Sequence, residues 1–311
     1  MRHIRFVPDD TNFKFMLHRR WTFPISVILM VVSIALFAGV GLNLGIDFKG
    51  GTLIEMKNKN GPFDIGEIRA TVGALGLGDF QVQEFGAPDD VLIRIERQQG
   101  GEEAQQRAVF LVRDAFGDTV DYRRVEVVGP RVSGELARAG TIAVIAALFA
   151  VLIYIWFRFE WQFAVGAIAA LVHDVIITIG MFSAMQIVFS LSSIAAILTI
   201  VGYSLNDTVV VYDRVRETLR KYKKRPIEGI LDLAVNQTLS RTTLTSVTTL
   251  LALISLYIFG GEVIRSFTFA MIFGILIGTY SSIFIAAPVL MYLNIRERGG
   301  DSEESGEAQT V

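Results

Sequence analysis

Six long apolar runs limit what this chain can fold into more than any other feature of its sequence. They cover residues 22–42, 139–157, 162–183, 188–211, 242–259 and 266–293. A helix needs about 20 residues to cross the roughly 30 Å of bilayer hydrocarbon, and in lipid only helices and closed barrels satisfy their own backbone groups. Because 52% of the residues are hydrophobic, the sequence predicts an α-helical membrane protein with six transmembrane helices.

Composition argues against several classes of site. The chain has no cysteine, so it has no disulfide, no thiolate metal site and no thiol nucleophile. A net charge of −2 without a strongly basic domain argues against nucleic-acid binding. Neither glycine-rich stretch, FKGGT or RQQGGEEA, ends in the GK[ST] of a phosphate-binding loop. We therefore expect no cofactor, no metal and no ATP site, so any work must draw on a partner or an ion gradient.

The distribution of Lys and Arg predicts the orientation of the chain. Five precede the first run, eight lie within residues 212–241 and two follow the last run, whereas the turn at 184–188 has none. Basic flanking segments stay in the cytoplasm. We therefore expect both termini and residues 212–241 on the cytoplasmic side. The expected organisation is a cytoplasmic segment 1–21, a retained first span 22–42 and an external domain 43–137. The remaining spans follow in 138–293, with a cytoplasmic loop at 212–241, and a disordered acidic cytoplasmic tail covers 294–311.

The external insert 43–137 reads as a small α/β domain. Alternating or apolar stretches predict strands at 51–58, 80–86, 90–97 and 119–128, and helical patterns lie at 64–77 and 101–117. Asp64 is placed to cap the first helix, Gly117 ends the second, and APDD at 87–90 resembles a turn. The order βαββαβ predicts a ferredoxin-like periplasmic domain.

Small and polar residues recur at three- and four-residue steps in four of the spans. Helices in lipid associate through such faces, so we expect these stripes to mark helix contacts. The stripes are Gly166, Ala170, His173 and Gly180; Ser192, Ala195, Thr199, Gly202 and Asn206; Arg241, Thr245, Thr248, Ala252 and Ser255; and Ala270, Gly274, Gly278 and Ser281. Ordinary packing explains most of this pattern, but it does not require charge.

Five charged or strongly polar residues fall inside or at the entry of these spans. They are His173, Asp174, Asn206, Asp207 and Arg241. An ionised side chain at the bilayer centre costs at least about 2.5–3.5 kcal/mol, so such residues usually mark an ion route or a water-filled interior. A purely structural hydrogen-bond cluster is the alternative. We favour a functional polar cluster on such an ion route.

The basic segment 212–241 carries two further patterns. An apolar face follows Pro226 and predicts a short amphipathic helix along the cytoplasmic surface, formed by Ile227, Ile230, Leu231, Ala234 and Val235. Its Lys and Arg neighbours either attract anionic membrane lipid or only enforce topology. Asp213 lies among Arg214, Arg216 and Glu217 and is expected at a solvated helix end.

Four motifs together resemble the SecF proteins of the SecD/SecF family, within the resistance-nodulation-division superfamily. They are GIDFKGG after the first span, VVGPRVSGEL before the second, HDV in the third and GYSLNDTVVVYDRVRE in the fourth. The resemblance covers essentially the whole chain; Lys49 departs from it, because Thr is more usual there. It implies that Asp207 and Arg241 belong to a proton path, and that His173 and Asp174 match the HD of the third span.

The resemblance also implies partners and a location. It places the chain in the bacterial inner membrane, multi-pass, in a heterodimer with SecD. Further implied partners are the SecYEG translocon, YajC, YidC and a preprotein substrate. The implied function is non-enzymatic: use of the proton-motive force to promote preprotein translocation and release on the periplasmic side.

Three other functions stay open from the residues themselves. Half of a small-molecule exporter of the same superfamily would share the intramembrane acids, although such exporters carry two six-span halves. An intramembrane protease could use Ser204 with His173, or a pair among Asp174, Asp207 and Asp213, but the motifs GxSG and GxGD are missing. A passive assembly scaffold would need the packing stripes without the charges.

The orientation can be tested because the chain has no cysteine of its own. Single cysteines introduced at Gln98 and Lys223 should label differently with a membrane-impermeant maleimide in intact cells. We expect labelling at position 98 and none at 223, since the basic segment is predicted to be cytoplasmic. The opposite pattern would overturn the orientation.

Overall fold

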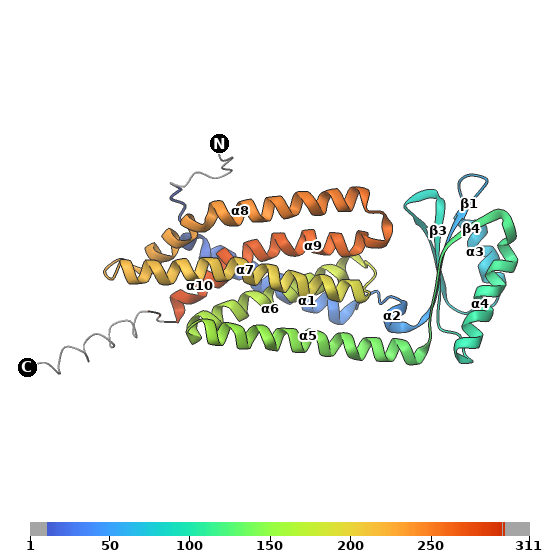
Figure 1. Ribbon diagram of the computed structural model, residues 1–311, viewed down its shortest axis with the longest axis horizontal. Helices are drawn as coiled ribbons and strands as arrows, with labels where there is room; N and C mark the ends of the chain where they lie inside the picture. Colours follow the sequence, from blue (N-terminus) through green and yellow to red (C-terminus); the bar gives the residue numbers. More distant parts are fainter. Residues whose placement is uncertain (1–10, 294, 296–311) are drawn as a thin grey trace, which may run out of the picture.

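The computed structural model describes residues 11–293 and 295, so the first ten residues and nearly all of the acidic tail lie outside the described chain. A helical bundle forms one end of the elongated molecule and the α/β domain forms the other (Figure 1). The bundle helices are α1 (Arg19–Gly39), α5 (Pro130–Arg158), α6 (Trp161–Met185), α7 (Leu191–Lys221), α8 (Ile227–Phe259) and α9 (Glu262–Ser281).

Within the described chain, six helices are long and apolar enough to span a membrane, which confirms the predicted architecture. Of these, α6, α7 and α9 are the most buried, whereas α1, α5 and α8 expose most of their apolar side chains. The inner helices therefore form the protein interior. The outer helices present the apolar surface that lipid or another membrane protein must cover.

Glycines bring the inner helices into close contact. A Cβ at Gly274 of α9 would lie 2.3 Å from the Ile200 side chain of α7, and one at Gly278 would lie 3.0 Å from Ser204 Cβ. A Cβ at Gly180 of α6 would lie 2.2 Å from Ser33 Oγ on α1. The predicted GxxxG face of the sixth span and the stripe of the third span are therefore contact faces inside this chain.

The stripes of the fourth and fifth spans are different. Nine of their ten members are exposed, on α7 at Ser192, Ala195, Thr199, Gly202 and Asn206, and on α8 at Arg241, Thr248, Ala252 and Ser255, whereas Thr245 is half-buried. We refer to these nine residues as the exposed polar stripes. Our expectation that they contact a neighbouring helix is wrong within the described part of this chain. Small and polar residues gain nothing from facing lipid, so the pattern points to a partner outside it.

The segment 212–241 is mostly helix and not a loop. α7 continues to Lys221 and α8 begins at Ile227, so only residues 222–226 connect them, at the end of the bundle opposite the α/β domain (Figure 1). The predicted surface helix after Pro226 is wrong as a separate element, because it is the first part of α8. Its apolar face is buried in the bundle, with Ile230, Leu231 and Ala234 fully covered.

The N-terminal residues help to cover that face. Met16, in the 3₁₀ turn Phe15–His18, is buried in the bundle core and its N–H donates to Asp232 Oδ1 (2.9 Å). Phe13 exchanges hydrogen bonds with the Asn236 amide, at 2.9 and 2.8 Å. The first turns of α8 thus pack against protein and are not a face laid on the membrane surface.

The last span ends irregularly. After α9 the chain forms a π-helical turn, Ser282–Ala286, followed by α10 (Ala287–Val289) and a 3₁₀ turn, Leu290–Tyr292. Pro288 explains the change, because its ring has no N–H and clashes with the carbonyl of the preceding helical turn. A widened turn removes that conflict.

The α/β domain has the ferredoxin-like order predicted from the sequence. Its elements are β1 (Gly51–Asn58), α3 (Ile65–Ala74), β2 (Phe80–Phe85), β3 (Ala87–Ile95), α4 (Gly101–Phe116) and β4 (Val120–Val128). The sheet order is β2-β3-β1-β4 with antiparallel neighbours. α3 and α4 cover the sheet face turned away from the bundle (Figure 1). Asp64 caps α3 as expected, its Oδ1 accepting from Gly66 N–H at 2.7 Å.

One turn in this domain differs from expectation. APDD is the start of β3 and not a turn, because the reversal occurs one residue earlier at Gly86, whose φ is +85°. Glycine adopts this conformation at little cost, so a single residue suffices to reverse the chain between β2 and β3.

A short helix missed by the sequence reading, α2 (Ile46–Lys49), joins the first span to the domain. Gly45 N–H donates to Phe189 O (2.8 Å), and Phe189 N–H donates to Asn43 O (2.8 Å). Asp47 Oδ2 accepts from the N–H of Leu191, the first residue of α7, at 2.9 Å. The linker is therefore bound to the α6–α7 turn and to the start of α7, and we call this set of contacts the linker clamp.

The α/β domain has its own core, so residues 43–137 should fold alone and unfold cooperatively. Ile54 is fully buried in that core, and Ile54→Ala should lower the free energy of unfolding by about 2–5 kcal/mol. Phe110→Ala, at a side chain 65% exposed on α4, should change it little. Urea denaturation of the purified fragments measures both. Equal effects, or an unfolded parent fragment, would contradict the assignment of an independent domain.

Candidate functional site

A carboxylate on α6 holds three helices together in the bundle interior. Asp174 is fully buried. Its Oδ2 accepts hydrogen bonds from Ser204 Oγ of α7 (2.6 Å) and Ser281 Oγ of α9 (2.8 Å). Oδ1 lies 2.9 Å from His173 Nδ1. Both oxygens are therefore satisfied, as a buried carboxylate requires.

His173 extends this polar cluster toward α1. Its ring is 1% exposed and stacks on Tyr280, with centroids 6.0 Å apart. The Tyr280 hydroxyl lies 3.0 Å from Ser26 Oγ and donates to Thr22 O at 3.3 Å. The other ring nitrogen of His173, Nε2, is buried without a hydrogen-bond partner among the described residues. We call Asp174, His173, Ser204, Ser281 and Tyr280 the Asp174 cluster.

Asp207 has a contrasting environment. It is 2% exposed on α7, and its Oδ2 is buried with no hydrogen-bond partner in the described part of the chain. An ionised carboxylate in such a place is costly, whereas a protonated one is tolerated more easily. Asp207 therefore differs from Asp174, whose two carboxylate oxygens both have partners.

Arg241 is close to Asp207 but not bonded to it. No ion pair within 4.0 Å joins them among the residues described. Arg241 is exposed at the side of α8, and Asn206 is exposed on α7. Of the five residues singled out in the sequence, the structure buries His173, Asp174 and Asp207, and it leaves Asn206 and Arg241 on the exposed polar stripes.

Asp213 lies apart from these residues, with its side chain 44% exposed. Our expectation that it lies at a helix end is wrong, because α7 continues for eight residues beyond it, to Lys221. Arg158 Nη2 donates to both of its carboxylate oxygens, at 2.8 and 2.9 Å. Arg216 Nη1 lies 4.0 Å from Asp213 Oδ1. The Asp213 carboxylate therefore links α5 to α7 at the surface and takes no part in the Asp174 cluster.

The geometry does not resemble a hydrolytic triad. In a triad the imidazole lies between the acid and the nucleophile. Here the Ser204 hydroxyl donates directly to Asp174, and His173 contacts the same carboxylate from its other oxygen. Among the described residues there is also no group of three or more His, Cys, Asp or Glu side chains that could hold a metal ion. What the site offers is a satisfied acid beside an unsatisfied one.

Sequence reasoning undervalued the partners of Asp174. Ser281 was noted only as a packing residue, Ser204 only as a nucleophile, and Tyr280 not at all. Ser204 precedes Asp207 by three residues, so both lie on one side of α7. That spacing could have linked Ser204 to Asp207. The contact between Asp174 and Ser281 joins residues 107 positions apart, and a single sequence gives no indication of it.

Removing the Asp174 carboxylate should destabilise the bundle more than removing that of Asp207. Asp174→Ala leaves Ser204, Ser281 and His173 without their acceptor, and each unsatisfied buried group costs about 1–3 kcal/mol. Asp207→Ala leaves no hydrogen-bonded partner of its Oδ2 behind. Asp213→Ala is the exposed control, with an expected loss of about 0–1 kcal/mol. Thermal unfolding in mild detergent ranks the three, and a Tm for Asp174→Ala at or above that of Asp207→Ala would refute this account.

Comparison with known proteins agrees with this architecture. Residues 111–296 match the family model described as protein export membrane protein SecD/SecF, C-terminal, and residues 35–57 match the SecD/SecF GG motif. The chain is 46% identical over 312 residues to the protein translocase subunit SecF of Cereibacter sphaeroides, covering 97% of this chain and 95% of that protein.

Fused proteins match as well. The chain is 45% identical to the protein translocase subunit SecDF of Brucella abortus, covering 99% of this chain and 41% of that one. The crystal structure of SecDF from Thermus thermophilus, a translocon-associated membrane protein, superposes with a TM-score of 0.83 at 32% identity, over 93% of this chain and 40% of that chain. The chain therefore spans about two fifths of the fused proteins and nearly the whole of the SecF proteins. It belongs to the SecD/SecF family of protein export membrane proteins.

Proposed function

We propose that this chain uses the proton-motive force to promote the translocation of preproteins and their release on the periplasmic side, with Asp207 as the residue that takes up and loses the proton. The single observation that carries the proposal is the buried, unpartnered Oδ2 of Asp207. The carboxylate of Asp174 has hydrogen-bond partners on both of its oxygens. A carboxylate that lacks a partner can change its charge when its surroundings move.

Arg241 supplies the counter-charge in this proposal. It lies beyond ion-pair distance of Asp207, so an approach of α8 to α7 would stabilise the ionised form and a retreat would favour protonation. One proton crossing the membrane releases about 2.3 kcal/mol per 100 mV. That is enough to shift a two-state equilibrium severalfold.

SecD is the proposed partner at the exposed polar stripes. The stripes carry Asn206 and Arg241, and lipid is a poor environment for either side chain. The SecDF relative of Brucella abortus, of which this chain covers 41%, carries both names in one chain, which supports SecD as the partner packed here. A partner helix on this surface would bury Arg241 and strengthen its effect on Asp207, because charges interact more strongly away from water.

The linker clamp offers a route from the proton site to the α/β domain. Asp207 and Leu191 belong to the same uninterrupted helix, α7. The N–H of Leu191 is bound to Asp47, three residues before the Gly50–Gly51 pair at which the sheet begins. A displacement of α7 would therefore reach the domain through one helix and one hydrogen-bonded joint.

The remaining parts of the proposal rest on the family. They are the SecYEG translocon, YajC and YidC as further partners, residence in the bacterial inner membrane with both termini cytoplasmic, and the absence of enzymatic activity or cofactor. The arrangement of Ser204 described above supports a non-hydrolytic role. A passive scaffold is the main competing function, and it differs in one respect: it needs no ionisable group at position 207.

Replacing Asp207 tests the proposal directly. Asp207→Asn keeps the shape of the side chain, so we expect normal assembly with SecD but loss of the proton-gradient stimulation of preprotein translocation. Arg241→Met should behave in the same way, because it removes the counter-charge. The measurement is translocation into inner-membrane vesicles with and without a proton gradient, at matched amounts of assembled complex.

Asp213→Asn is the matched control, since Asp213 is an acid on the same helix that is paired at the surface. It should keep the full gradient response. If Asp207→Asn also keeps that response, Asp207 is a packing residue and the chain acts as a scaffold.

A further inference from the structure

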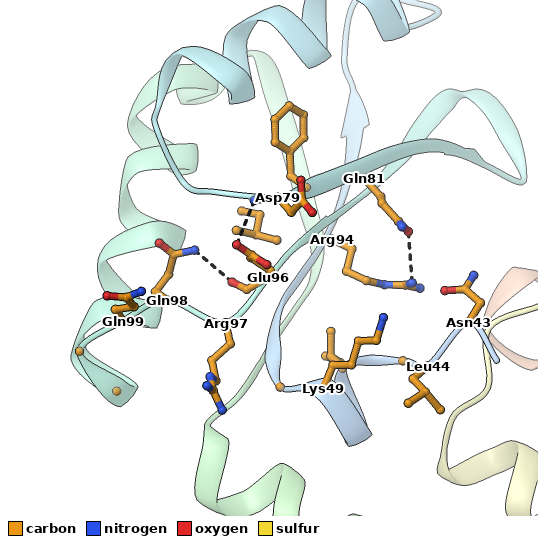
Figure 2. Close-up of a pocket in the computed structure, with 17 residues that line it drawn as sticks. Asn43, Leu44, Lys49, Asp79, Gln81, Arg94, Glu96, Arg97, Gln98 and Gln99 are labelled. Atoms are coloured by element: carbon orange, nitrogen blue, oxygen red, sulfur yellow. Dashed lines mark hydrogen bonds between the residues drawn. The ribbon is translucent and has the colours of Figure 1, made fainter. Parts of the chain in front are cut away.

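A cavity of about 920 Å³ lies where the α/β domain meets the helical bundle. Its walls come from the linker after α1, from α2, from the adjoining ends of β2 and β3 and from residues 96–101 (Figure 2). None of the residues discussed for proton coupling lines it, and its existence does not depend on the proposed function.

Three cationic side chains line this cavity: Lys49, Arg94 and Arg97. Figure 2 shows the Lys49 amine directed toward the Arg94 guanidinium, with the side chain of Asn43 beside them. Among the residues described, no ion pair within 4.0 Å involves any of the three cations. Two like charges that converge without an acid repel each other, and an anion between them would relieve that repulsion.

Arg94 is the most buried of the three. Its Nη1 donates to Gln81 Oε1 over 3.4 Å, a long hydrogen bond, and its Nε is buried without a partner in the described structure. Burial lowers the pKa of the Arg94 guanidinium, with no carboxylate to oppose that effect. The arginine fork therefore has donors and charge to offer to a ligand.

The two acids in the cavity wall do not serve this purpose. Glu96 Oε1 accepts from the N–H of Asp79 at 3.1 Å, so this carboxylate is turned toward the backbone of the β2 side. Asp79 itself is exposed. The wall thus carries three cations against two acids, and the acid whose contact is known faces away from the cations.

The position of the cavity indicates which anion reaches it. α1 ends at Gly39, and Asn43 and Leu44 of the cavity wall follow within one further turn of chain. If α1 spans the hydrocarbon, the cavity opens at the level of the lipid headgroups. Leu44, Ile46 and Phe80 add apolar wall beside the cations, which suits a ligand that is charged at one end and apolar at the other.

We propose that this cavity binds the phosphate of an anionic phospholipid, held by Lys49 and Arg94 with the amide of Asn43 beside them. A guanidinium fork matches two phosphate oxygens, and an ammonium adds a point charge. Free inorganic phosphate offers the same chemistry, so the test must separate the two sources.

The test uses the full-length protein purified in neutral detergent. Thermal unfolding is followed during titration with phosphatidylglycerol, with phosphatidylcholine and, separately, with inorganic phosphate. We expect phosphatidylglycerol to raise the Tm in a saturable way and phosphatidylcholine to do so much less. Lys49→Gln and Arg94→Gln should each weaken the apparent affinity for phosphatidylglycerol about tenfold or more, the effect of losing one charge-assisted contact.

Arg107→Gln is the matched control, because Arg107 is an exposed cation on α4, on the other side of the sheet. It should leave the affinity unchanged. Arg94→Lys, which keeps the charge but not the fork, should fall between wild type and Arg94→Gln. If Arg94→Gln does not fold, the exposed Lys49 decides the matter alone.

Each outcome has a definite meaning. A response to phosphatidylglycerol alone through Lys49 and Arg94 assigns a lipid site, and an equal response to inorganic phosphate assigns a phosphate site open to either source. The proposal is overturned if the cavity variants and Arg107→Gln bind phosphatidylglycerol equally well, or if phosphatidylcholine stabilises as strongly. Hexaglutamate is titrated in the same way, as a probe for an acidic peptide. The proposal is also overturned if hexaglutamate raises the Tm through Lys49 and Arg94 while phosphatidylglycerol and inorganic phosphate do not.

Discussion

The carboxylate of Asp174 is the interaction on which the bundle interior depends. It accepts from α7 and α9 through one oxygen and contacts His173 through the other, so three inner helices converge on one side chain. The close approach permitted by Gly278 next to Ser204 brings α9 near enough for this arrangement. A buried acceptor with several donors also penalises any sliding of the helices, because each displacement would leave a polar group unsatisfied.

The two buried acids, Asp174 and Asp207, therefore differ in their hydrogen bonding. Asp174 fixes the axial positions of α6, α7 and α9 relative to one another. Asp207 lies one turn along α7 from Ser204, and its Oδ2 has no hydrogen-bond partner among the described residues. Proteins tolerate such a residue when surrounding contacts over-determine the structure and when the unsatisfied group has a function. On the proposed function, a change of charge at Asp207 would leave the contacts of Asp174 intact, because none of the hydrogen bonds described for Asp174 involves Asp207.

Much of this could be read from the sequence. Hydropathy found the six spans, and alternation found the four strands, because each signal is local and repeats every few residues. Hydropathy did not predict that α7 and α8 extend into residues 212–241. It reports which residues avoid water, and a charged segment outside the bilayer can still be helical. Asn206 and Asp207 were grouped because they are adjacent, but neighbours on a helix are turned about 100° apart, so one is buried and the other is exposed. The contacts of Asp174 needed the tertiary structure, and the exposed polar stripes still need a second chain to explain them.

The uninterrupted course of α7 has a mechanical consequence. Asp207 is 16 residues from Leu191 and 14 from Lys221, hence about 24 Å and 21 Å along the helix axis from either end. Asp207 thus lies near the middle of α7. A tilt of about 5° there would swing both tips by about 2 Å in opposite directions. One end of α7 is hydrogen-bonded to Asp47, in the linker to the α/β domain. The other end lies beside the basic turn at residues 222–226. A tilt of α7 about Asp207 would therefore displace both ends of the helix by about the same distance.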